Sequence, residues 1–326
     1  MSLLLKSRVI YGGIFLAALT GCSPEKADEQ QTTATTTPVA QPAPVNYQLA
    51  TAEITNANNF ALKQEPIYFS FYDLGIAADD SAVKNLNVLS GAAAQASQTV
   101  DTDGDGALDG LLLAADFNPA EIKSFTISSD PAIAKPALKK QTQAEISIKE
   151  GGEWNGKEYV GGTFKNVDRV TPPAQYSDHS YWIRYEGPGI ESDKVAYRVY
   201  LDWRNGFDIF GKKTSDVVLQ NVGLDGYDSY HENADWGVDV LKVGKSLGMG
   251  GFGFWNGKAV DLVSKVDTRD AIITNNGDLY SGFKINYNGW EINNQKVDLA
   301  AHFSMNAGSR LVNVKLKASE QLPNMA

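Results

Sequence analysis

Arginine, aromatic and carboxylate side chains alternate with apolar residues in the stretch KVAYRVYLDWRN, residues 194–205. Successive side chains of a β-strand point to opposite faces of the sheet, so this alternation predicts two unlike faces. The predicted core face holds Val195, Tyr197, Val199, Leu201 and Trp203. The opposite face holds Ala196, Arg198, Tyr200, Asp202 and Arg204. Guanidinium, phenol and carboxylate groups on one face can bind an anion and transfer protons.

The preceding segment SYWIRYE, residues 180–186, has the same alternation, and we expect it to form a neighbouring strand. Trp182, Arg184 and Glu186 share one parity, so pairing of the two strands would place them beside Arg198, Tyr200, Asp202 and Arg204. The alternative is the solvated outer face of an antiparallel sheet, which performs no chemistry. The abundance of Arg, Trp and Tyr favours a binding site, because these residue types are enriched at recognition surfaces.

Two of the three histidines lie in loop-like contexts rich in Tyr, Asp, Arg and Trp, namely His179 and His231. Histidine is the most common general acid or base near neutral pH, so these two are the candidates for proton transfer. Each also has an alternative interpretation as a hydrogen-bonded structural imidazole. His302 lies in an alternating apolar strand, which indicates a structural role.

The sequence DTDGDGALDG resembles part of a calcium-binding loop of the EF-hand type. Asp101, Asp103, Asp105 and Asp109 occupy positions 1, 3, 5 and 9 of such a loop, and Gly106 lies at the turn. Leu112 stands where the bidentate glutamate is normally found. Two interpretations stay open: a structural Ca²⁺ site, or a hairpin turn rich in Asp and Gly. No cofactor is expected for the chemistry itself.

The N-terminal residues have the three regions of a bacterial lipoprotein signal peptide. Lys6 and Arg8 precede an apolar run, and small residues lead to Cys22, the only cysteine of the chain. We therefore expect residues 1–21 to be removed, Cys22 to carry lipid, and residues 22–45, rich in Thr, Gln, Ala and Pro, to form a disordered tether. Ser23 follows the cysteine, as in lipoproteins that are carried to the outer membrane. We therefore expect an outer-membrane lipoprotein that faces either the periplasm or the cell surface. The membrane would then be contacted through the lipid only.

Composition predicts an all-β protein, with thirty glycines and no long amphipathic helix. We expect a small β-sandwich module over residues 46–150 and a large antiparallel β-sandwich over residues 151–326. The glycine-rich stretch EGGEWNGKEYVGG would be the hinge between them. The last strand-like run ends at Ala318, so we expect the second sandwich to be incomplete.

The formal net charge is −10, and it becomes −12 when Lys6 and Arg8 leave with the signal peptide. An acidic protein of this kind is a poor partner for nucleic acid. The arginines between residues 184 and 204 are a local exception, and clusters of arginine usually face anions.

The runs YSDHSYWIRYE and YHENADWGVDVLKVGKSLGMGG, together with the Asp-rich loop, resemble an exported bacterial family catalogued as a domain of unknown function. The resemblance implies an accessory role in polysaccharide-utilisation loci, often those for pectin and other uronate-rich polymers. The C-terminal module is similar to the supersandwich of galactose mutarotases and polysaccharide lyases, although fold likeness alone assigns no chemistry.

These observations predict a lipoprotein that acts on uronate-containing oligosaccharides or polysaccharides, as a lyase or dehydratase. Removal of the proton α to a uronate carboxylate requires a base, a cation on the carboxylate and an acid at the leaving oxygen. His231 or His179 would be the base, and Tyr200 or Tyr230 the acid. Arg184, Arg198 or Arg204 would bind the carboxylate, while Glu186 and Asp202 orient the arginines and Trp182, Trp203 and Trp236 stack on sugar rings. The alternatives are a non-catalytic surface glycan-binding protein and a mutarotase-like sugar isomerase.

Overall fold

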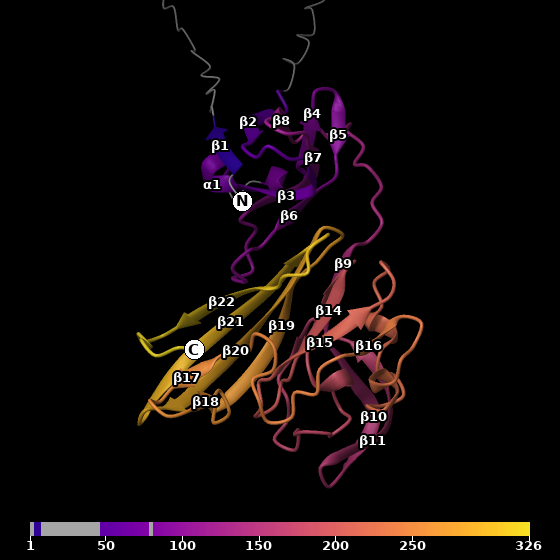
Figure 1. Cartoon of the computed structure of the whole chain (residues 1–326), viewed down its shortest axis with the longest axis vertical. Helices are drawn as coiled ribbons and strands as arrows, with labels where there is room; N and C mark the ends of the chain where they lie inside the picture. The colour runs from indigo at the N-terminus through magenta and orange to yellow at the C-terminus, as the bar shows by residue number, and fades with distance from the viewer. Residues whose placement is uncertain (1–2, 8–45, 78–80) are drawn as a thin grey trace, which may run out of the picture.

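The computed structural model describes residues 3–7, 46–77 and 81–326, and its regular secondary structure is almost entirely β-strand (Figure 1). The prediction of an all-β chain is confirmed. Cys22 and the expected tether, residues 22–45, lie outside the described residues, as does most of the expected signal peptide. No helix in the described part of the chain is long and apolar enough to cross a membrane.

The first module contains two antiparallel sheets around one apolar core. The core is built from Phe69, Leu113, Phe125 and Ile127 among others. One sheet has the order β1 (Leu3–Ser7), β2 (Gln48–Asn56), β8 (Ile122–Ser128), β4 (Asn87–Ser90) and β5 (Ala93–Gln95). The other has the order β3 (Leu62–Ser70), β7 (Gly110–Phe117) and β6 (Ser97–Val100). A short helix α1 (Phe71–Leu74) and a 3₁₀ turn η1 (Ser81–Asn85) complete the module.

The second module is a sandwich of two five-stranded antiparallel sheets. The first sheet, called here the site sheet, has the order β16 (Gly237–Asp239), β15 (Phe207–Lys212), β14 (Val195–Val199), β13 (Gly189–Ser192) and β9 (Thr142–Glu145). The second, the long sheet, has the order β12 (Arg169–Val170), β19 (Thr268–Asn276), β20 (Tyr280–Ile292), β21 (Gln295–Asn306) and β22 (Asn313–Ala318). Two hairpins are attached to them, β10 (Ser147–Asn155) with β11 (Glu158–Asn166), and β17 (Gly253–Trp255) with β18 (Val260–Leu262).

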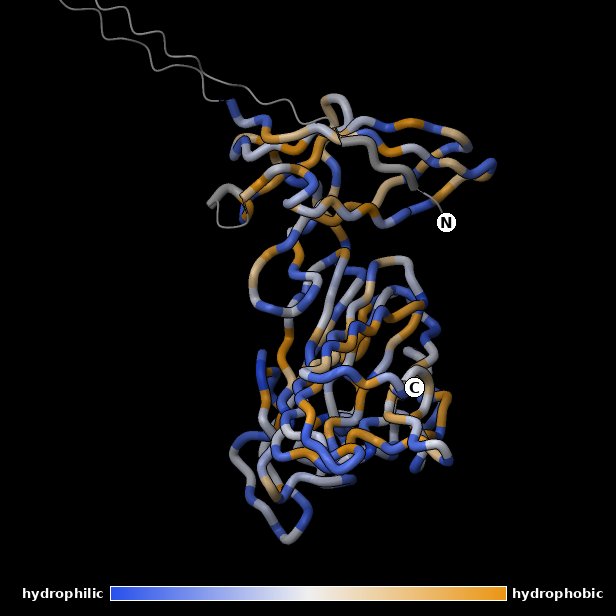
Figure 2. The backbone as a smooth tube through the Cα atoms, turned by 90° about the vertical axis from the view of Figure 1, so that its left-hand side faces the viewer, coloured by the Kyte–Doolittle hydropathy of each residue, from blue (hydrophilic) through white to orange (hydrophobic). Residues whose placement is uncertain are grey.

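The main core lies between the site sheet and the long sheet. Four of the five residues predicted for the core face of residues 195–203 are buried there, namely Val195, Tyr197, Val199 and Leu201. Trp203 is instead 38% exposed, because it lies in the turn that follows β14. In Figure 2 apolar segments run along the strands of this module, whereas the β10–β11 hairpin at its end is mostly hydrophilic.

The chain passes from the first module to the second between β8 and β9, earlier than the predicted boundary at residue 150. Strand β9 pairs with β13 of the site sheet, and Ile146 is buried in the main core. The stretch EGGEWNGKEYVGG is therefore not a hinge between the modules. It forms the β10–β11 hairpin, in which Trp154 and Tyr159 pair across the strands and Gly156 accommodates the positive φ angle at the turn.

The Asp-rich loop of the first module rests on the long sheet of the second, and Figure 1 shows it extending toward that sheet. The Asn275 side chain donates a 2.7 Å hydrogen bond to the carbonyl of Asp101 and accepts one of 3.2 Å from its N–H. The Gln98 side chain similarly bonds both backbone groups of Tyr280. Paired contacts of this kind satisfy buried polar groups on both sides and fix how the modules join.

Loops between residues 213 and 236 cover the outer face of the site sheet and form a second apolar cluster there, with Tyr185, Phe210, Leu219 and Tyr230. A fully buried ion pair anchors the start of this cover, with 2.6 Å between Lys212 Nζ and Glu191 Oε2. The Glu191 carboxylate also accepts hydrogen bonds from the N–H groups of Val218 and Leu219. These bonds offset the desolvation of the two charges.

We predict that Lys212→Met lowers the free energy of unfolding by about 3–5 kcal/mol, because it leaves the Glu191 carboxylate buried without its cation. Denaturant unfolding of the two proteins measures the difference. Lys63→Met is the matched control: its partner Asp116 is exposed, so the loss should stay below about 1 kcal/mol. Equal losses in the two variants would contradict the anchoring role of Lys212.

Candidate functional site

The polar face predicted for residues 196–204 exists, but most of it is buried beneath the cover loops. Arg198 is 2% exposed, and all three of its guanidinium nitrogens have partners. Its Nη2 lies 2.6 Å from Asp208 Oδ2 and 3.2 Å from Asp239 Oδ2, and its Nη1 donates to the Tyr230 hydroxyl at 2.8 Å. Despite the opposing effect of burial, these surrounding groups raise the pKa of Arg198 above its usual range. Arg198 is thus a permanent cation held by the protein's own carboxylates.

Arg204 is buried against three carboxylates in the turn that follows β14. Its Nε lies 3.0 Å from both oxygens of Asp202, its Nη2 2.7 Å from Glu186 Oε1, and its Nη1 3.0 Å from Asp178 Oδ1. The guanidinium also stacks on the Tyr200 ring, 4.0 Å from the ring centroid. Glu186 and Asp202, predicted to orient the arginines, both contact Arg204, and their predicted role in a site stays a prediction.

Arg184 points away from this group, because residues 180–186 do not form the predicted strand. Arg184, Tyr185 and Glu186 form a 3₁₀ turn, η2 (Arg184–Glu186), in which Tyr185 and Glu186 have φ angles of 38° and 70°. The turn directs Arg184 to Glu145 and to the carbonyl of Gln220, and it directs Glu186 toward Arg204. The sequence prediction was wrong here because long-range ion pairs determine the backbone of this segment.

Backbone strain is concentrated in the same segment. His179 and Tyr181 also have positive φ angles, 57° and 59°, so four of the eight residues from 179 to 186 adopt the left-handed region. Residues other than glycine rarely do so, and such strain gathers at functional sites, where the surrounding structure maintains it. Residues 178–186 are therefore the best candidate for a functional segment.

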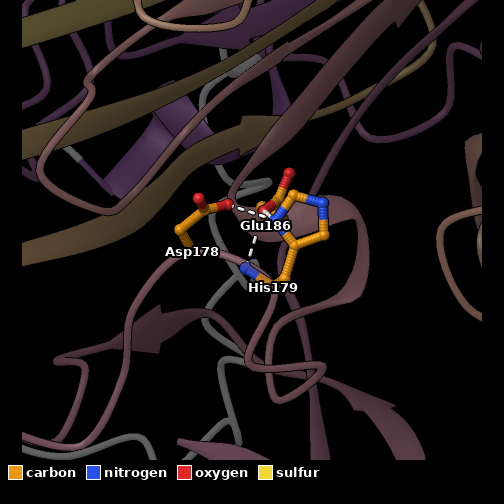
Figure 3. Close-up of side chains that lie close together, drawn as sticks. All are labelled: Asp178, His179 and Glu186. Carbon is orange, nitrogen blue, oxygen red and sulfur yellow. Dashed lines mark hydrogen bonds and ion pairs between the residues drawn. The ribbon is translucent and has the colours of Figure 1, made fainter.

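The His179 imidazole lies at the surface between two carboxylates (Figure 3). Its Nδ1 contacts Asp178 Oδ1 and is 3.7 Å from Glu186 Oε1, while its backbone N–H donates to Glu186 Oε1 at 3.1 Å. The side chain is 55% exposed, and no described residue hydrogen-bonds its Nε2. Asp178 therefore orients the ring and leaves Nε2 open to a ligand, an arrangement suited to a general base.

The same three residues bring their ligand atoms within 4.8 Å of one another, a spacing that a metal ion would fit. Both carboxylates already contact Arg204, however. This local positive charge opposes cation binding, so the geometry suits proton transfer better than metal coordination.

His231 has both ring nitrogens directed at the protein. Its Nδ1 bonds the carbonyl of Tyr227, and its Nε2 lies 3.4 Å from Asp239 Oδ2, although the ring is 53% exposed. His231 thereby joins the Arg198 network through Asp239. The two histidines are connected through Tyr227, whose ring also makes an edge contact with that of His179 at 5.2 Å.

The two tyrosines predicted as acids are buried. The Tyr200 hydroxyl is 3.1 Å from Asp208 Oδ2, and that of Tyr230 accepts from Arg198. Burial raises the pKa of both phenols. Raised pKa values and lack of exposure make them more suitable for holding Arg198 than for protonating a leaving group.

The three tryptophans do not form one platform. Trp236, at the end of the cover loops, makes an edge contact with Phe210, with 6.0 Å between ring centroids. Trp182 lies between Trp154 and Tyr176, at 6.2 and 5.9 Å. Trp203 lines a separate surface pocket of about 270 Å³ together with Tyr176, Asp202 and Arg269. Sequence reasoning missed Arg269, since strand parity near residue 269 gives no sign that its guanidinium would line the pocket beside Trp203.

The Asp-rich loop brings together three of its four predicted ligands. Oxygens of Asp101, Asp103 and Asp109 lie within 4.8 Å of one another, and Asp105 is outside this group. Asp101 accepts hydrogen bonds from the N–H groups of Gly104 and Gly106, which shape the loop. His302 lies beneath the loop, and its Nε2 is hydrogen-bonded to the Thr274 hydroxyl at 3.0 Å. These contacts are consistent with the structural role predicted for His302.

Asp239 gives a pH-dependent prediction. Burial and then the charge of Asp208 raise the pKa of Asp239 from 3.8 to about 6, against the opposing effect of Arg198. The folded state therefore binds the proton more tightly than the unfolded chain, and this stabilising contribution is lost as the pH rises from about 4 to above about 6.

We expect the free energy of unfolding of the wild type to fall, relative to that of Asp239→Asn, across this pH range. Denaturant unfolding of both proteins at several pH values measures it. An identical pH dependence in the two proteins would show that the carboxyl titrates normally.

Taken together, the fold and the site define a two-module β-sandwich protein with a buried arginine–carboxylate network and an exposed histidine at its edge. Residues 54–326 match the family described as a domain of unknown function, DUF4861, and the chain belongs to that family. Neither the curated proteins nor the solved structures yield a significant match to it.

Proposed function

We propose that this protein is an exported lipoprotein that acts on uronate-containing oligosaccharides as a lyase or dehydratase, with His179 as the base. The observation that carries the proposal is the open Nε2 of an exposed imidazole that is oriented by Asp178 and sits on a strained segment. Such an imidazole can remove the proton α to a uronate carboxylate.

The choice of His179 over His231 follows from their contacts. His231 has its Nδ1 on a carbonyl and its Nε2 facing Asp239, so it has no nitrogen free for a substrate. We assign it a positioning role, in which it supports the carboxylate that holds Arg198. The location at the outer membrane, the lipid on Cys22, the link to polysaccharide-utilisation loci and the relation to the supersandwich are parts of the same proposal.

The first experiment tests turnover. Purified protein is incubated with unsaturated and saturated uronate oligosaccharides, and products are followed by ultraviolet absorbance and by the mass change for loss of water. We expect His179→Gln to lower the rate at least about a hundredfold, the usual contribution of a general base, while substrate binding is kept. His231→Gln is the matched control and should keep more activity.

Two results would argue against this assignment. Full activity of His179→Gln would exclude this residue as the base. Binding of oligosaccharides by the wild type without any product would instead support the second candidate function, a surface glycan-binding protein. That candidate is favoured by the partly exposed rings of Tyr176, Trp182, Trp154 and Tyr159.

We also propose that the Asp-rich loop binds a structural Ca²⁺ through Asp101, Asp103 and Asp109, whose oxygens have the necessary proximity. Ca²⁺ at about a hundred times its dissociation constant should stabilise the protein by about 2.7 kcal/mol. Asp103→Asn should reduce this gain, whereas Asp105→Asn should keep most of it, since Asp105 is outside the group. Thermal unfolding with Ca²⁺ and with a chelator measures it, and equal behaviour of all three proteins would contradict the site.

A further inference from the structure

The pocket beside Trp203 lies where the turn after β14, the segment around residue 173 and the start of β19 meet. Its volume is about 270 Å³, and its walls include Pro173, Tyr176, Asp202, Trp203 and Arg269. Trp203 is 38% exposed and presents an aromatic surface to this space. Ser177, two residues before His179, lines the same pocket, so the pocket adjoins the strained segment.

Arg269 differs from the arginines of the predicted site in having no counter-ion. Its Nη2 donates a 3.0 Å hydrogen bond to the carbonyl of Ser264, and its Nη1 is fully buried without a partner. No carboxylate of the described residues lies within 4.0 Å of its guanidinium, whereas Arg184, Arg198 and Arg204 each have one. A charge without a counter-ion is unfavourable in the free protein, and because Arg269 lines the pocket, an anion bound there would compensate that charge.

The acidic residues in the pocket wall have closer cationic partners, although the charge of Asp202 also acts on Arg269. Asp202 is paired with Arg204, and Asp267 is paired with Lys296. The hydroxyl of Tyr287, a fully buried residue outside the pocket wall, also lacks a hydrogen-bond partner. An unpaired guanidinium and an open aromatic surface therefore meet in one pocket.

We infer that this pocket binds a saccharide unit that carries an anionic group, a carboxylate or a sulfate, with Arg269 contacting the anion and Trp203 stacking on the ring. The choice of a glycan as the ligand rests on the proposed function. The anion-binding role predicted for Arg184, Arg198 and Arg204 is assigned to Arg269 instead. Guanidinium groups bind such anions with charge-assisted hydrogen bonds.

An aromatic row leads away from the pocket and indicates that the ligand is an oligosaccharide. From Tyr176 in the pocket wall, ring centroids follow at 5.9 Å to Trp182, 6.2 Å to Trp154 and 5.3 Å to Tyr159 on the β10–β11 hairpin. All four residues are partly exposed, and Tyr176 and Trp182 also pack against the main core. Sugar units beyond the anionic one would lie along this row.

The binding experiment compares tetragalacturonate with its methyl ester, which has the same sugars without the charge, by calorimetry. A sulfated galactan oligosaccharide forms a third arm that separates carboxylate from sulfate recognition. We expect Arg269→Gln to weaken binding of the preferred anionic ligand at least about tenfold and to leave binding of the ester unchanged. Arg310→Gln, at an exposed position, is the matched control and should bind like the wild type.

A stability measurement separates recognition from a structural role. Removal of an unpaired buried charge should leave the melting temperature of free Arg269→Met at or above that of the wild type, while Arg198→Met should lose stability. A clear drop for Arg269→Met would show that Arg269 is structural and would overturn the inference. So would equal affinity of the wild type for the charged and the esterified oligomers.

The outcomes for the two proposals differ. If binding depends on the ligand's charge and on Arg269 but no product forms, the binding pocket is supported and the lyase or dehydratase activity is contradicted. If turnover requires His179 but is unaffected by Arg269→Gln, the enzymatic activity is supported and the role of the pocket is contradicted.

Discussion

The burial of Arg198 beneath the cover loops is the constraint on which the second module depends. A guanidinium removed from water requires nearby carboxylates and hydrogen-bond acceptors. They come from β15 (Asp208), β16 (Asp239), the turn η2 (Glu186, Tyr185) and η4 (Ser229–His231), which holds Tyr230. These segments are far apart in the sequence, so one side chain determines where the site sheet, its cover and the strained segment meet.

Glu186 transmits this constraint to the surface. Its carboxylate is 3.7 Å from Arg198 and 2.7 Å from Arg204, and it also accepts the N–H of His179. The backbone of the exposed His179 is thereby held by the buried Glu186 carboxylate, while the partly exposed Asp178 orients its ring. Such rigid support from behind is what a proton-transfer group needs for its geometry to be maintained.

Some of this could be predicted from the sequence. The alternation at residues 195–201 identified both faces of β14, because a side-chain period of two is a local property of a strand. The backbone of residues 180–186 could not be predicted from the sequence, because contacts with distant residues determine it, such as Glu186 with Arg204 and Arg184 with Glu145. The role of Arg269 could not be predicted either, because its neighbours in the sequence do not reveal that its guanidinium has no carboxylate partner in the fold.

The buried arginines and Arg269 illustrate two uses of one residue type. Where carboxylates surround the guanidinium, its donors are occupied and it contributes to the native structure. Where they are missing, the fold retains an unfavourable charge, and natural proteins tolerate such local losses mainly where function requires them.

The reciprocal hydrogen bonds between Asn275 and Asp101 have a consequence for how the protein unfolds. If the first module unfolded, the Asn275 side chain in β19 would lose both of its hydrogen bonds to Asp101. If the long sheet unfolded, the Asp-rich loop would lose the same two bonds. Each module is therefore part of the other's native environment. These contacts couple the stabilities of the two modules, because each contact is lost when either module unfolds.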